Sequence, residues 1–64
     1  MGTISRKYRV SVWEMPKWNS HTSKEILQWC RENCGDQWID WSYASWEFRF
    51  RYKKTYAHFL LRWK

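Results

Sequence analysis

One stretch, residues 46–52, constrains the fold most. Aromatic and charged residues alternate along it in the order Trp46, Glu47, Phe48, Arg49, Phe50, Arg51 and Tyr52. Successive side chains of a β-strand point to opposite faces, so a strand here has one aromatic face and one charged face. The pattern predicts a half-buried strand of an antiparallel sheet, with its aromatic side toward the core.

The length of the chain limits what this strand can belong to. With 64 residues there is room for one domain, which we predict over residues 1–64, with a loosely held tail at residues 1–5. Seven Trp, four Tyr and three Phe compensate for the small core, because each buried aromatic side chain hides roughly 150–250 Å². So small a domain cannot enclose all of them. We expect Trp29, Trp46 and Trp63 in the core, and Trp13, Trp18 and Trp38 at the surface.

A second alternating stretch lies near the N-terminus. Tyr8, Val10 and Val12 alternate there with Arg9, Ser11 and Trp13. This predicts a first strand whose Tyr/Val side faces inward and whose basic side faces out. Pro16 ends it, because proline cannot donate a ladder hydrogen bond.

Two stretches have the helical period. Residues Thr22 to Glu25 match the S/T-x-x-E capping box and predict a helix over residues 23–34, with Gly35 as the left-handed residue that ends it. The apolar side chains of that helix fall on one face. Between residues 53 and 64, apolar residues recur at the spacing i, i+3, i+4, i+7, namely Tyr56, Phe59, Leu60 and Trp63, and predict a second helix.

The remaining segment connects the first helix to the opening strand. Gln37–Trp41 is a short apolar run that predicts a strand with Ile39 and Trp41 on one side. Residues 42–45 contain no Gly or Asn for a tight primed turn, which favours a longer loop or a bulge. The predicted fold is an α+β domain of order β-α-β-β-α, with a three-stranded sheet and two helices on one face. It corresponds to a ferredoxin-like split unit without its last strand.

Charge and cysteine spacing bear on partners and compartment. The net charge is +6, and residues 48–64 carry six bases and no acid. Cys30 and Cys34 are four residues apart on a helix, about 5–6 Å between Cβ atoms, which is too far for an unstrained disulfide. The N-terminus has no apolar signal segment, and no apolar run is long enough to cross a membrane. These features favour an intracellular protein with reduced thiols.

The sequence indicates no enzyme, because it contains no recognisable catalytic residues, phosphate loop or dinucleotide motif. A zinc site built from Cys30, Cys34, His21 and His58 is an alternative. However, the cysteines fall on the apolar helix face, where small buried hydrophobes are the expected role. We therefore predict no metal and no cofactor.

Binding is the remaining class of function, and the candidate binding residues are basic or aromatic: Arg9, Trp13, Trp18, Arg49, Arg51, Lys53 and Lys54. Trp, Tyr and Arg are enriched in protein interfaces, so the favoured partner is a protein with an acidic surface. The alternatives are a single-stranded nucleic acid, stacked on Trp13 and held by the arginines, and self-assembly or a virion role. An open sheet edge would permit a homo-oligomer.

The C-terminal third also resembles a known group. Residues 46–51, Trp-Glu-Phe-Arg-Phe-Arg, followed by residues 57–63, Ala-His-Phe-Leu-Leu-Arg-Trp, are similar to the ending of small uncharacterised tailed-phage proteins. In those proteins an aromatic strand precedes a terminal helix with the motif A-x-x-F-x-L-R-[WF]. The resemblance implies a bacteriophage protein that acts in the cytoplasm of a bacterial host, where it would inhibit or redirect a host protein. It implies no particular catalytic or binding residue.

Overall fold

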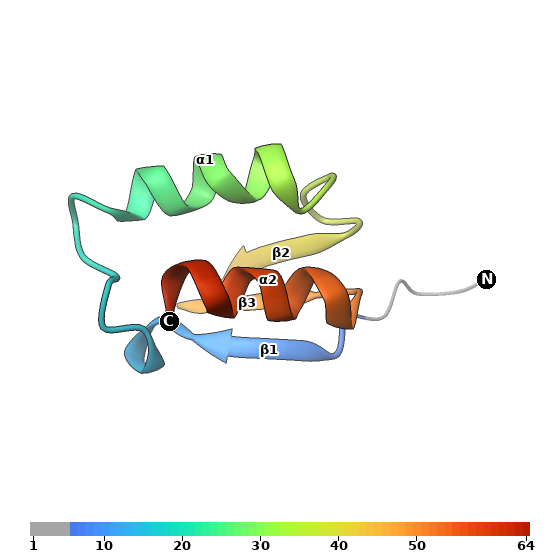
Figure 1. The fold of residues 1–64 in the computed structure, drawn as a ribbon, viewed down its shortest axis with the longest axis horizontal. Helices are drawn as coiled ribbons and strands as arrows, with labels where there is room; N and C mark the ends of the chain where they lie inside the picture. The colour runs from blue at the N-terminus through green and yellow to red at the C-terminus, as the bar shows by residue number, and fades with distance from the viewer. Residues whose placement is uncertain (1–5) are drawn as a thin grey trace.

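Residues 6–64 are described by a computed structural model, and the predicted tail at residues 1–5 lies outside them. The elements follow in the order β1 (Tyr8–Ser11), a 3₁₀ turn η1 (Val12–Glu14), α1 (Ser23–Asn33), β2 (Trp41–Ala44), β3 (Glu47–Phe50) and α2 (Lys53–Trp63) (Figure 1). The predicted α+β class and the predicted β-α-β-β-α order are confirmed.

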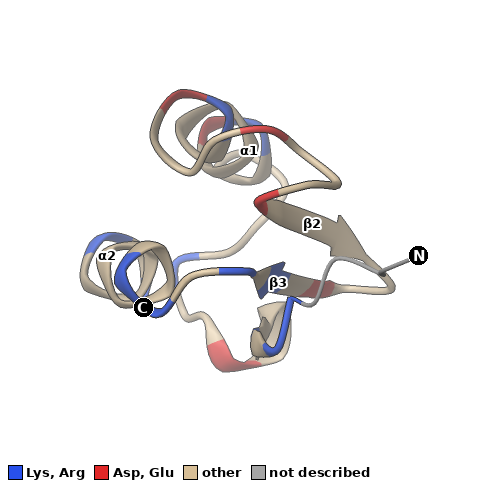
Figure 2. Ribbon diagram, turned by 90° about the vertical axis from the view of Figure 1, so that its right-hand side faces the viewer, with Lys and Arg blue, Asp and Glu red and all other residues tan. Residues whose placement is uncertain are grey.

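The three strands form one antiparallel sheet in the order β1-β3-β2. Because β1 and β2 both run antiparallel to β3, they are parallel to each other, and α1 connects them across the central strand. Figure 2 shows α1 and α2 on the same side of the sheet. This is the predicted split unit, with β3 in the middle.

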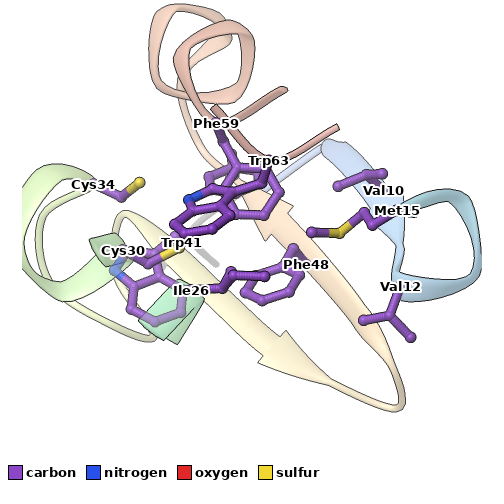
Figure 3. Close-up of a cluster of buried hydrophobic side chains, with 11 residues drawn as sticks. Val10, Val12, Met15, Ile26, Cys30, Cys34, Trp41, Phe48, Phe59 and Trp63 are labelled. Carbon is purple, nitrogen blue, oxygen red and sulfur yellow. The ribbon is translucent and has the colours of Figure 1, made fainter. Parts of the chain in front are cut away.

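The core lies between the sheet and the two helices. Two rows of inward side chains cross the sheet, Tyr8–Phe50–Trp41 and Val10–Phe48–Tyr43. Figure 3 shows Phe59 and Trp63 of α2 and Ile26 and Cys30 of α1 gathered around Phe48 and Trp41 of these rows. The alternation that predicted β3 therefore holds for Phe48 and Phe50, which are both fully buried.

The predicted second strand is wrong in its position. Residues 38–40 form turns, and β2 begins at Trp41, where the predicted strand ended, and occupies the predicted loop. A two-residue turn joins β2 to β3, and both its residues have positive φ, 53° at Ser45 and 64° at Trp46, as a type I′ turn requires. The Val12 amide donates to the Trp46 carbonyl at 2.9 Å and holds the turn from outside. Neighbouring structure thus imposes a conformation that Gly or Asn normally provides.

The predicted capping box at Thr22 is also wrong. Thr22 makes no side-chain cap, because its hydroxyl donates to the Lys17 carbonyl instead. The same S/T-x-x-E pattern occurs earlier in the chain, at Ser11 and Glu14, and there it forms the box. The Ser11 hydroxyl accepts from the Trp13 amide, and the Glu14 carboxylate accepts from the Ser11 amide at 3.0 Å.

Gly35 follows α1 with a φ of 93°, as predicted for the residue that ends the helix. A Cβ atom at this position would run into the Asp40 carboxylate, which accepts from the Asp36 amide at 3.0 Å. We expect Gly35→Ala to lower the free energy of unfolding by about 1–3 kcal/mol through backbone strain and this clash. Urea denaturation measures the change. Lys24→Ala on the exposed face of α1 is the control, with an expected change within about 0.5 kcal/mol, and equal effects would contradict this account.

Candidate binding surface

The open sheet face is the side of the sheet that points away from the helices. Two outward rows of side chains form it, Arg9–Arg49–Ser42 and Ser11–Glu47–Ala44. A hollow of about 300 Å³ lies over β2 and β3, lined by Arg6, Trp38, Ser42, Ala44, Ser45, Glu47 and Arg49. No aromatic side chain projects from the strands onto this face, because the aromatic residues of the strands all occupy the alternate positions that point toward the helices.

Positive charge dominates the open sheet face. Arg9 and Arg49 lie directly opposite each other on neighbouring strands, a like-charge pairing that disfavours the sheet. Arg49 has its own counter-ion, since its Nε is 2.7 Å from the Glu47 carboxylate, whereas Arg9 has none among residues 6–64. Arg6 donates to the Ser42 hydroxyl at 3.2 Å and to the Trp38 carbonyl at 2.6 Å. The face thus presents three guanidinium groups against one carboxylate.

Exposed tryptophans stand at both ends of this face. At the hairpin end, the rings of Trp13 and Trp46 are in contact, with centroids 6.1 Å apart, and their exposed fractions are 81% and 56%. Trp38, also 56% exposed, lies at the opposite end, where β2 begins. Trp38 and Trp46 both have positive φ, 73° and 64°. A left-handed conformation costs a bulky L-residue about 1–2 kcal/mol, so the fold holds these two indoles outward against local preference.

The other tryptophans serve the core. Trp63 is buried as predicted, and Trp29 is half-buried against Phe59 and Trp63. The prediction that Trp46 belongs to the core is wrong, because the tight turn takes it out of the alternation of β3. The prediction that Trp18 is exposed is also wrong. Its ring packs on Tyr43 and Phe48, on the helix side of the sheet.

The predicted binding residues therefore separate into groups. Arg9, Trp13 and Arg49 come together on or beside the open sheet face, whereas Trp18 does not reach it. Lys53 and Lys54 lie in the first turn of α2, across the sheet. Arg51 follows the last residue of β3, and its guanidinium carbon lies 5.3 Å from the centre of the Tyr52 ring.

Sequence reasoning did not select Arg6, Trp38 or Trp46 as binding residues. One signal was available for Trp46, because its neighbour Ser45 is a turn-forming residue type between two alternating stretches. Arg6 and Trp38 lie in irregular segments, and no periodic pattern places them.

The free edge of β1 is where a fourth strand would pair, but side chains of the chain itself occupy it. Along an antiparallel strand, the main-chain groups of alternate residues point toward the partner strand and away from it. The Val12 amide donates to the Trp46 carbonyl, so the main-chain groups of Arg9 and Ser11 point away from β3. Glu14 accepts from the Ser11 amide, and the Tyr56 hydroxyl donates to the Arg9 carbonyl at 3.3 Å. These contacts oppose the addition of a strand at this edge.

Metal-binding and redox groups are not gathered at this surface. Across residues 6–64, no three His, Cys, Asp or Glu side chains converge as metal ligands would. Cys30 and Cys34 are free and buried. The neighbouring Cys34 thiol, together with burial, raises the pKa of Cys30 above its ordinary value. The His58 ring packs edge-on against Trp29.

In comparisons with known proteins, no protein-family model, curated protein or solved structure matches the chain. Within residues 6–64, none of the helices has the length and apolar character needed to span a bilayer.

Proposed function

We propose that the protein is a non-enzymatic binding module whose open sheet face docks a partner protein with an acidic surface. The observation that carries this proposal is the pair of exposed indoles, Trp38 and Trp46, held at positive φ at opposite ends of the face. Backbone strain of this kind persists where surrounding structure enforces it, and it concentrates at functional sites. Trp and Arg are also the residue types that dominate interface hot spots.

The charges on the face suit a protein better than a nucleic acid. Glu47 lies within the face and would repel a phosphate backbone running across it, whereas a protein can place a basic or polar group there. The guanidinium of Arg9, which has no counter-ion within residues 6–64, would donate to a partner carboxylate, and this would also relieve its repulsion with Arg49. In a bacteriophage protein, as the sequence resemblance implies, such a partner would be a host protein that the module inhibits or redirects.

Single-stranded nucleic acid is the second candidate for the same face. The contacting indoles of Trp13 and Trp46 offer a stacking surface, and Arg9 and Arg49 lie beside them. Each stacked base would contribute on the order of 1–3 kcal/mol, and the affinity would fall steeply with salt. Self-assembly through this face is a third reading, which would appear as a concentration-dependent mass in solution.

We expect the double variant Arg9→Glu/Arg49→Glu to lose partner binding, because reversal of both charges repels an acidic surface. The expected weakening is at least about 30-fold, since a buried interfacial charge contributes 2 kcal/mol or more. Immobilised protein, a nuclease-treated lysate and quantitative mass spectrometry identify the partner, and titration with that purified protein gives the dissociation constants.

Lys24→Glu/Arg31→Glu is the matched control, because it makes the same change in net charge on the outer side of α1, where both residues are exposed. It should bind within about threefold of the unmodified protein. If the two variants lost equal affinity for the partner, the loss would be an effect of net charge alone, and this would contradict the proposed site. A partner that disappears after nuclease treatment would favour the nucleic-acid alternative.

A further inference from the structure

A second charged surface lies on the other side of the molecule. The α2 outer face is the solvent-exposed side of the C-terminal helix and its end, with the side chains of Lys53, Lys54, His58, Leu61, Arg62 and Lys64. Leu61 is 86% exposed and lies near the middle of this face on a helical projection, close to Lys54 and Ala57. In Figure 2 the ribbon of α2 carries blue segments and no red, whereas α1 carries both colours.

The neighbouring helix shows what an ordinary solvated face looks like in this protein. The outer side of α1 has two bases, Lys24 and Arg31, and two acids, Glu25 and Glu32. One acid, Glu25, lies in the first turn and one base, Arg31, in the last turn, as the helix dipole favours. Mixed charges of this kind keep a surface soluble without creating a field of one sign.

α2 differs from α1 in the charges of its first turn. It has no acidic residue there, and Lys53 and Lys54 stand at the end where the helix dipole disfavours positive charge. Four bases and no acid lie between residues 53 and 64. Helix stability does not explain this arrangement, and departures from local rules are expected at functional surfaces.

We propose that the α2 outer face binds duplex nucleic acid through the phosphate backbone. The helix has 11 residues and is about 16 Å long, while the major groove of B-DNA is about 12 Å wide. Lys53 and Lys54 at one end, and Arg62 and Lys64 at the other, can therefore reach phosphates on both sides of the groove. Ala57, between them, is small enough for close approach, and Leu61 offers an apolar contact to a thymine methyl group.

An anionic membrane fits the same charges less well. An interfacial helix inserts a continuous apolar face beneath its basic residues. On the α2 outer face, Leu61 is the one large apolar side chain, since Phe59 and Trp63 are buried in the core. The inferred activity is separate from the proposed function of the open sheet face, and together the two surfaces would allow the protein to bring a partner protein to nucleic acid.

The test measures fluorescence anisotropy of a labelled duplex of about 20 base pairs across a range of salt concentrations. Four phosphate contacts predict that the binding constant falls about 100-fold between about 50 and 200 mM salt. The double variant Lys53→Gln/Lys54→Gln removes two of these contacts. Its affinity at low salt should be at least about 10-fold lower than that of the unmodified protein. Its binding constant should fall only about 10-fold between about 50 and 200 mM salt.

Two matched variants remove the same amount of charge elsewhere. Arg9→Gln/Arg49→Gln on the open sheet face and Lys24→Gln/Arg31→Gln on α1 should each stay within about threefold of the unmodified protein. The proposal is overturned if either weakens duplex binding as much as the α2 variant, or if no duplex binding appears at low salt. Binding to vesicles rich in anionic lipid without binding to the duplex would also overturn it, as would a preference for single strands that depends on Trp13.

Discussion

Replacing Phe48 by alanine should remove at least about a third of the free energy of unfolding of the protein. Phe48 is fully buried on the central strand, and its ring lies 4.6 Å from the ring of Tyr43 and 4.9 Å from that of Phe59. A buried Phe→Ala change costs about 3–5 kcal/mol. A domain of this length has a total stability of about 3–10 kcal/mol, so the loss is between about a third of the total and all of it.

Far-UV circular dichroism and tryptophan emission during urea unfolding measure this effect. Leu61→Ala is the matched control, because it removes a large apolar side chain that is 86% exposed, and it should change stability by no more than about 0.5 kcal/mol. A loss of less than about 1 kcal/mol for Phe48→Ala would contradict a core centred on β3.

The elements that sequence predicts well are those with a local periodic pattern. Alternation from Tyr8 to Val12 and from Phe48 to Phe50 predicted β1 and β3, and the helical spacing of Tyr56, Phe59 and Trp63 predicted α2. Their order predicted the split unit. Each of these patterns reflects the burial of one face, which is the interaction that dominates in a small domain.

β2 could not be predicted, because its position depends on a distant contact. The Ser45–Trp46 turn adopts positive φ without Gly or Asn, and the amide of Val12 holds it in place from the end of β1. Local propensity favoured a longer loop at residues 42–45. The same error put Trp46 in the core, since alternation was extended one residue too far.

The candidate surface was predictable only in part. Strand parity placed Arg9 and Arg49 on the side away from the helices, and the order of the strands made them neighbours. The positions of Arg6 and Trp38 depend on irregular segments and on one contact between them, from the Arg6 guanidinium to the Trp38 carbonyl. No local pattern encodes such a contact.

Replacement of Trp38 and Trp46, whose backbone conformation is strained, should stabilise the fold and abolish binding. In the variant Trp38→Asn/Ser45→Asn/Trp46→Gly, each new residue tolerates positive φ, and the turn acquires the favoured Asn-Gly pair. Relief of strain, less about 0.5–1.5 kcal/mol for the lost contact with Trp13, should raise stability by about 1 kcal/mol. The melting temperature should then rise by about 4–8 °C. Affinity for the partner should fall at least about 100-fold, because two hot-spot side chains are lost.

Trp13→Ala separates the two effects, because Trp13 has no positive φ. It should weaken binding without any gain in melting temperature. If the triple variant were less stable than the unmodified protein, positive φ at Trp38 and Trp46 would not be a source of strain, and strain would not mark these residues as functional. If it were more stable and bound its partner normally, the indoles would have no role in binding.

Photo-cross-linking tests most directly whether the open sheet face docks a partner protein. A photoreactive phenylalanine analogue is placed at Trp13, at Trp38 or, as the control, at Gln28 on the exposed side of α1, and the cells that make the protein are irradiated. We predict that positions 13 and 38, at opposite ends of the face, cross-link to the same partner protein and that position 28 does not. Cross-links to that partner from position 28 alone, or cross-links from positions 13 and 38 to nucleic acid only, would contradict the proposed function.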